Sequence, residues 1–213
     1  FAPRDPGLGT VLVMLGVEGE IPELAHHNFL FSDDWSDDFD AVFNGPVASR
    51  PQAASKSIYV SKPSATDPGV APAGHENLFV LVPVPADPSV GHGDMYRGEA
   101  SEQVQRIADA AIEQIAARCG VAGLGRRIVV KQTLGPADFA ERYNAWSGGS
   151  IGPAHTLRQS AFLRGSNKSR KMDSLMYAGA TTTPGVGVPM CLISAENVLK
   201  RVRGDRSSGP LDH

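Results

Sequence analysis

A glycine- and proline-rich segment near the carboxyl end carries the residues best suited to contact a ligand. It holds three glycines and two prolines: Gly179, Pro184, Gly185, Gly187 and Pro189. A glycine lets the backbone come close to a bulky or charged group that a Cβ would exclude. The prolines stiffen the same loop. The surrounding sequence predicts a strand, a glycine turn, a proline–glycine loop and a helix that begins near Met190.

The start of that helix is the second feature with chemical meaning. Its free backbone N–H groups would point at whatever the loop holds, which suits a phosphate or the electron-rich pyrimidine edge of a reduced flavin. On spacing alone, a tight turn without a ligand explains the segment equally well, because short glycine motifs have low specificity. The helix is indicated by apolar positions that are expected to pack inward: Leu192, Ile193, Ala195, Val198 and Leu199.

Other residues with chemical potential lack the spacing that a site needs. His26 and His27 are adjacent on a predicted strand, so their side chains are expected on opposite faces, and no acidic or cysteine partner has ligand spacing. We therefore expect no metal. Ser160 lacks the G-x-S-x-G surround of a hydrolase nucleophile. Cys191 follows the glycine loop directly, and a small apolar packing role is expected for it.

Composition narrows the class of protein. The chain has 213 residues, 41% of them hydrophobic, with 20 basic and 23 acidic side chains. Nearly balanced charge argues against a nucleic-acid partner and gives no sign of a basic membrane patch. Without a long apolar run or a signal-peptide pattern, we expect neither a transmembrane span nor secretion. The composition fits an α/β or α+β protein of one or two domains, soluble or peripherally membrane-bound.

Periodicity indicates the elements that must position the glycine loop. Strands are predicted over residues 11–15, 27–31, 57–61, 78–82 and 128–134, and helices over residues 35–43, 101–118 and 136–143. Ser101 is the expected amino-terminal cap of the second helix. Pro83 and Pro85 are expected to end the strand before them, because proline cannot donate a ladder hydrogen bond. The polar segment 204–213 is expected to be disordered.

The glycine loop also resembles a family signature. Residues 179–189, GATTTPGVGVP, resemble the carboxyl-terminal flavin signature of bacterial phytoene desaturases (phytoene dehydrogenases), which is approximately G-A-x-T-H-P-G-x-G-x-P. Segments 24–28, 67–68, 72–85, 148–152 and 159–164 resemble the same family in the same order. The resemblance runs from about Val11 to Val202. Thr183 and Gly165 depart from it, since the family usually has His and Pro there, so any role of those side chains is in doubt.

The resemblance implies a fold and a division of labour. It implies part of an FAD-dependent flavoprotein of amine-oxidase-like, Rossmann-type α/β (α+β) fold, with a substrate-domain β-sheet and a carboxyl-terminal flavin-binding strand–loop–helix. Residues 1–147 would belong to the polyene-binding domain and residues 148–203 to the FAD-binding domain. This sequence has no G-x-G-x-x-G fingerprint, so the amino-terminal half that binds the pyrophosphate is expected to lie on a preceding segment or a partner chain.

The resemblance also assigns residues to the site. The implied cofactor is FAD, and the implied contacts are Gly179, Ala180, Pro184, Gly185, Val186, Gly187, Val188, Pro189 and Met190. Catalytic residues are unknown. His155, Arg158 and Arg164 are weak candidates because they lie just before the flavin segment, and surface solvation is the stronger alternative explanation for them.

The implied function is desaturation of phytoene or a related polyene by hydride transfer to the flavin. A related carotenoid isomerase, saturase or oxygenating flavoprotein stays open, as does a catalytically silent fragment. The implied partner is a carotenoid polyene, and the implied location is cytoplasmic, with peripheral association at the inner face of the membrane as an option. A hydrocarbon offers no polar handle, so its binding must come from buried apolar area. The strands over 11–15, 57–61 and 78–82 are expected to form part of that surface.

Overall fold

The computed structural model describes residues 4–44 and 54–211, which form two compact units. The sheet unit comprises Leu8–Ser150, and the loop unit comprises Ile151–His213 together with Phe1–Gly7. The functional division expected from the sequence, with a polyene-binding part up to residue 147 and an FAD-binding part from residue 148, stays a prediction, because these units are defined by contacts and not by what they bind.

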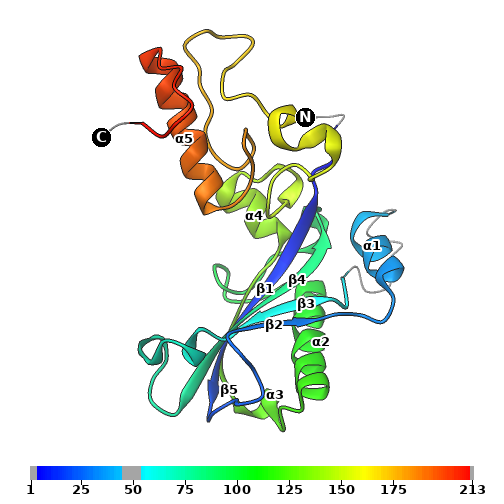
Figure 1. Ribbon diagram of the computed structural model, residues 1–213. Coiled ribbons are helices and arrows are strands. Elements are labelled where there is room, and N and C mark those ends of the chain that lie inside the picture. Colours follow the sequence, from blue (N-terminus) through cyan, green and yellow to red (C-terminus); the bar gives the residue numbers. More distant parts are fainter. Residues whose placement is uncertain (1–3, 45–53, 212–213) are drawn as a thin grey trace. The chain divides into compact units, whose positions relative to one another are not determined.

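The sheet unit is built on five antiparallel strands in the order β2-β3-β4-β1-β5 (Figure 1). The strands are β1 (Leu8–Glu18), β2 (His27–Leu30), β3 (Ile58–Ser61), β4 (His75–Pro85) and β5 (Ile128–Leu134). Every strand predicted for this unit is confirmed. The protein is therefore of mixed α/β class, with an antiparallel sheet.

The core lies between one face of this sheet and the helix α2 (Glu102–Cys119). Alternate residues of the two long central strands point into it, since successive strand side chains face opposite sides. These residues are fully or nearly fully buried: Val11, Val13, Leu15 and Val17 of β1, and Leu78, Val80, Val82 and Val84 of β4. Helix α2 adds residues at three- and four-residue spacing: Val104, Ile107, Ala108, Ala111, Ile112 and Ile115. The intervening strand residues are mostly only half-buried, so the opposite face of the sheet stays open.

One local expectation about this core was wrong, and another holds only for the position of the residue. Strand β4 does not end at Pro83 but continues to Pro85. The Pro83 carbonyl accepts a hydrogen bond from the Ser55 backbone N–H at 2.9 Å, so its ring nitrogen also faces away from β1, where the absent N–H breaks no ladder bond. Ser101 precedes α2 as expected, but its hydroxyl donates to the His92 carbonyl and does not cap the helix.

The remaining helices of the sheet unit are short. They are α1 (Trp35–Phe43), α3 (Leu124–Arg127) and α4 (Pro136–Tyr143). The Asp34 carboxylate accepts from the Ser36 N–H at 2.8 Å and so caps α1, and Pro136 occupies the first turn of α4. The helices predicted over residues 35–43, 101–118 and 136–143 are all confirmed. The sequence also predicts a loop over residues 44–56, where glycine, proline and serine residues break any period, but most of that segment lies outside the described residues.

The loop unit contains one long helix, α5 (Val188–Arg203), and otherwise turns and short 3-10 helices. The strand predicted before Gly179 is wrong, because residues 172–178 make only an isolated bridge between Met176 and Lys168. The segment 204–211 is held against α5: Lys200 Nζ donates to the Ser207 carbonyl at 3.1 Å, and the Asp205 N–H donates to the Lys200 carbonyl at 2.9 Å. The expected disorder of the tail is therefore not found up to Leu211. Among the described residues, no helix is long and apolar enough to cross a membrane.

Candidate functional site

The glycine loop of the loop unit has backbone angles that glycine adopts far more readily than other residues. Gly179, Gly185 and Gly187 have φ values of 114°, 150° and 110°, in the region that L side chains rarely adopt. A Cβ placed on Gly179 or Gly187 would have no described atom within 4 Å, and one on Gly185 would meet only the Arg164 side chain, at 4.0 Å. The loop therefore borders open space with backbone alone, which fits close approach by a flat ring.

The start of α5 lies at the end of this loop. Gly187 is the residue before the first turn, no side chain caps it, and Pro189 occupies the first turn. The first intrahelical bond recorded at this end runs from the Cys191 N–H to the Gly187 carbonyl at 2.9 Å. By helix geometry, the preceding N–H groups of Val188 and Met190 have no intrahelical acceptor. These donors suit an electron-rich edge of a bound group, so the residues present fit a flavin ring.

The Arg164 side chain is hydrogen-bonded to the backbone of the glycine loop. Its side chain is 3% exposed and donates only to backbone carbonyls: Ala180 at 2.7 Å, Pro153 at 2.9 Å, Ile151 at 3.2 Å and Gln159 at 3.3 Å. Burial, reinforced by the Arg4 guanidinium, lowers the pKa of Arg164 from its ordinary value. The guanidinium therefore ties residues 151–159 to the glycine loop. The other weak catalytic candidates, His155 and Arg158, are exposed.

Sequence reasoning missed three buried polar side chains next to the same loop. Asn167, Thr182 and Ser194 are 3%, 4% and 0% exposed, and all three are hydrogen-bonded to one another. One signal was available for Ser194, which is a polar residue within the apolar series of the predicted helix. Buried polar groups of this kind are costly unless paired, so they mark a specified arrangement.

The open face of the sheet is a second candidate surface. Strand register places Phe29, Tyr59, Leu81 and Leu12 in one row across β2, β3, β4 and β1. The next row contains Phe79 opposite Met14. Paired residues of neighbouring strands share a face, so these side chains form a continuous apolar surface opposite α2. We refer to it as the open sheet face.

A cavity of about 760 Å³ adjoins this face. Its lining includes Met14, Tyr59, Phe79, Val70 and Val130, with His75, Glu76 and Asn77 as polar members. Sites for small molecules are commonly apolar cavities of this size with a few convergent polar groups. The expected apolar surface on the central strands is therefore present in the sheet unit.

The adjacent histidines are arranged differently from the sequence expectation. The rings of His26 and His27 do not lie on opposite faces, because their centroids are 4.2 Å apart. His26 precedes β2 and so escapes the strict alternation of a strand. His26 Nδ1 is hydrogen-bonded to Thr66 at 2.7 Å, and His27 Nδ1 to the Tyr59 hydroxyl at 2.6 Å. Among the described residues, no group of three or more His, Cys, Asp or Glu side chains could hold a metal ion.

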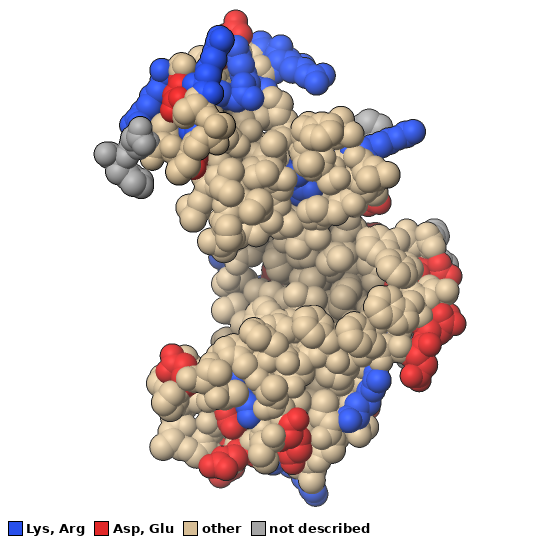
Figure 2. All heavy atoms as spheres, viewed as in Figure 1, with Lys and Arg blue, Asp and Glu red and all other residues tan. Residues whose placement is uncertain are grey.

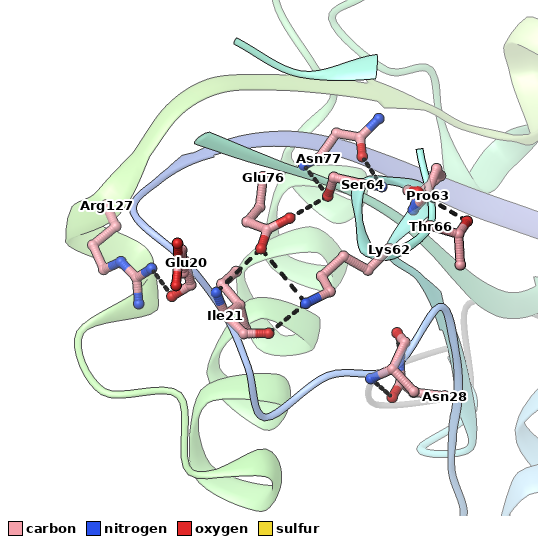
Figure 3. A network of polar contacts seen from close by, with 11 residues as sticks. Glu20, Ile21, Asn28, Lys62, Pro63, Ser64, Thr66, Glu76, Asn77 and Arg127 are labelled. Atoms are coloured by element: carbon pink, nitrogen blue, oxygen red, sulfur yellow. Dashed lines mark hydrogen bonds and ion pairs between the residues drawn. The ribbon is translucent and has the colours of Figure 1, made fainter. Parts of the chain in front are cut away.

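Figure 3 shows an ion pair between the buried Lys62 and the half-buried Glu76, a residue of the cavity lining. Lys62 Nζ lies 3.5 Å from Glu76 Oε1 and donates to the Ile21 carbonyl at 2.6 Å. Burial alone would raise the pKa of Glu76, but hydrogen bonds from the Ser64 hydroxyl and the Ile21 N–H, with the charge of Lys62, lower it below its ordinary value. Glu76 is therefore a paired carboxylate, which suits a structural role better than proton transfer.

Comparison with known proteins finds relatives that are similar to this chain over most of its length. No family model matches the chain. A carotenoid 3,4-desaturase of Haloarcula japonica is 44% identical over 194 residues, which are 91% of this chain and 36% of that protein. A 4,4'-diapophytoene desaturase (4,4'-diaponeurosporene-forming) of Staphylococcus aureus is 31% identical over 210 residues, which are 98% of this chain and 40% of that protein.

The chain thus spans about two fifths or less of the length of these relatives. The match covers both units, including the glycine loop and the open sheet face. The resemblance inferred from the glycine loop is confirmed: over nearly its whole length the chain is similar to carotenoid desaturases, and it corresponds to a carboxyl-terminal part of these relatives.

Proposed function

We propose that the full-length protein is an FAD-dependent oxidoreductase that desaturates a carotenoid-type polyene. The main support for this proposal is the glycine loop, whose backbone borders open space next to a helix start that no side chain caps. The chain that contains this loop is 44% identical to a carotenoid 3,4-desaturase. When bound, FAD would supply the hydride acceptor for the desaturation: one substrate carbon would give up a hydride, and its neighbour would lose a proton to solvent as the double bond forms.

The residues of this chain would hold one end of the cofactor. The flavin ring would lie against Gly179–Ala180 and the segment Pro184–Met190, with backbone N–H groups at the start of α5 facing it. The pyrophosphate would be held by a G-x-G-x-x-G segment of the Rossmann type that is not among these 213 residues. The greater length of the relatives is consistent with such a segment.

The open sheet face would bind the polyene. Phe29, Tyr59, Leu81 and Phe79 present apolar area that is partly exposed to solvent, and burial of apolar area is the force available to bind a hydrocarbon. At roughly 25 cal/mol per Å² of apolar surface, burying about 300 Å² of polyene would contribute on the order of 7 kcal/mol before ordering costs. Polar anchors are not required for that affinity.

A pair of glycine variants of the full-length protein tests the flavin site. We expect Gly187→Val to lower flavin affinity about tenfold or more, because its side chain enters space that no described protein atom occupies. Gly98→Val is the matched control: Gly98 also has positive φ and open surroundings, but it lies in the sheet unit. Flavin content is measured by absorbance after release. If the two variants retain equal flavin, the loop is only a turn.

A second pair tests the polyene surface. Phe79→Asp places a carboxylate on the wall of the apolar cavity, so we expect conversion of a carotenoid-type polyene, followed by chromatography, to fall at least tenfold with flavin content unchanged. Met95→Asp is the control, since Met95 is exposed in the same unit and does not line the cavity. Normal turnover in a folded Phe79→Asp protein would remove the open sheet face from the proposal.

We also propose a cytoplasmic location with peripheral contact to an anionic membrane. Figure 2 shows Lys and Arg side chains gathered on the loop unit, and Lys200, Arg201 and Arg203 lie in the last turn of α5. Exposed Leu192 and Leu199 lie on the same helix, and apolar and basic groups together favour such a surface. Cosedimentation with vesicles tests the membrane contact. Failure to bind vesicles that contain anionic lipid would exclude that contact.

A further inference from the structure

The backbone of Gly179 is held at both its polar groups by a closed ring of hydrogen bonds. The Gly179 N–H donates to Ser194 Oγ at 3.0 Å. Thr182 Oγ1 donates to the Gly179 carbonyl at 2.9 Å, so in the 2.7 Å contact between the two hydroxyls Ser194 must be the donor to Thr182. The ring therefore starts and ends on one glycine, passing through a helix residue and a loop residue.

Asn167 closes the arrangement from the other side. Its side-chain amide nitrogen lies 3.1 Å from both Ser194 Oγ and the Tyr177 carbonyl, and 3.2 Å from both Thr182 Oγ1 and the Thr183 carbonyl. Two N–H groups thus serve four acceptors. With Gly179 N–H and Asn167 donating to it, the Ser194 hydroxyl is fully used, which makes the proton directions in the ring unique.

We propose that Ser194 and Thr182, supported by Asn167, are positioning residues. They fix where the Gly179 backbone and the start of α5 lie relative to the flavin ring. The inference rests on the proposed flavin site and names the residues that shape that site. Gly179 has a φ of 114° and faces open space, so its own packing does not fix it. Ser194 is 0% exposed and belongs to the helix whose first turn borders that space, so the ring couples loop and helix.

Variants of the full-length protein that change only the hydroxyl groups test this role. Thr182→Val keeps the shape and removes the hydroxyl, Thr182→Ser keeps the hydroxyl, and Ser194→Ala leaves the Gly179 N–H without its acceptor. We expect Thr182→Val and Ser194→Ala to weaken FAD binding about tenfold, the effect of one unpaired buried group. We also expect both variants to shift the reduction potential of bound flavin. The FAD affinity of Thr182→Ser should stay within about twofold of that of the unchanged protein.

The control is Thr10→Val, the same substitution at a buried threonine of the sheet unit. The melting temperature of each flavin-free variant is measured in parallel. If Thr182→Val does not fold, Ser194→Cys replaces it; its weaker hydrogen bonding should give an intermediate loss. The positioning role would be overturned if Thr182→Val, or Ser194→Cys where it replaces that variant, had the FAD affinity and flavin reduction potential of the unchanged protein. It would also be overturned if Thr182→Ser and Thr182→Val were equally impaired. Either result would leave the flavin site intact. An unchanged protein that binds no FAD would instead overturn the proposed function.

Discussion

The ion pair of Lys62 and Glu76 gives the sharpest test of how the sheet unit is held together. Their side chains are 6% and 13% exposed, and the pair links the segment at Ile21 to β4. Glu76→Gln keeps the shape and removes the charge, which leaves the Lys62 ammonium buried with the Ile21 carbonyl as its main acceptor. We expect a loss of about 2 kcal/mol in the free energy of unfolding. A full 3–5 kcal/mol is not expected, because the glutamine oxygen can still accept from Lys62.

A double-mutant cycle separates this electrostatic effect from simple loss of packing. In a Lys62→Met background, no ammonium group is left without its carboxylate partner. Glu76 still accepts hydrogen bonds from the Ser64 hydroxyl and the Ile21 N–H. Glu76→Gln should then cost only about 0.5 kcal/mol, a coupling of about 1.5 kcal/mol. Urea unfolding at neutral pH can be followed by tryptophan fluorescence, since Trp35 and Trp146 both lie in the sheet unit.

The result that would refute the reasoning is additivity. If Glu76→Gln costs the same in both backgrounds within about 0.5 kcal/mol, the carboxylate does not stabilise Lys62. Glu76, shown in Figure 3, would then be held in place by its bonds from the Ser64 hydroxyl and the Ile21 N–H.

Two further predictions concern the same unit. The pKa of Glu76 is lowered from 4.5 in the folded state, so its stabilisation is present above that pH and is lost as the pH falls through the lower folded value; urea midpoints below about pH 5 should fall less steeply in Glu76→Gln than in the unchanged chain. A parallel fall in both would show that other groups carry the acid sensitivity. Thr10 is 2% exposed and its hydroxyl is the only buried side-chain polar atom without a partner among the described residues, so Thr10→Val should raise the free energy of unfolding by about 1 kcal/mol, which the urea midpoint measures. A lowered midpoint would mean that the hydroxyl is satisfied.

The sequence was sufficient for the sheet unit because its elements have clear periods. Helix α2 shows apolar residues at three- and four-residue steps, and β1 and β4 are runs of branched side chains. The error at Pro83 has a different origin. Whether proline ends a strand depends on which side its missing N–H faces, and that side is set by the neighbouring strand and not by the local sequence.

The loop unit was harder because side chains, and not periodicity, shape it. The apolar stretch before Gly179 predicted a strand, but the Tyr177 N–H donates to the Asn167 carbonyl within a compact loop, and its carbonyl accepts from the Asn167 side chain. A single asparagine that serves four acceptors leaves no pattern in the sequence. The glycines are easier to interpret from the sequence, because glycine permits the positive φ values that Gly179, Gly185 and Gly187 adopt, although it does not require them.

Helix α5 shows where a correct period still gives a wrong conclusion. Its apolar positions were expected to pack inward, yet Leu192, Ile193 and Leu199 are 68%, 41% and 40% exposed. The position buried most completely is instead Ser194, through hydrogen bonds to the glycine loop. A hydrophobic period identifies which face of a helix is apolar, but only a neighbouring element decides whether that face is covered. In this unit the helix is therefore oriented by its one buried hydroxyl, which is also why Ser194 is the residue most worth changing.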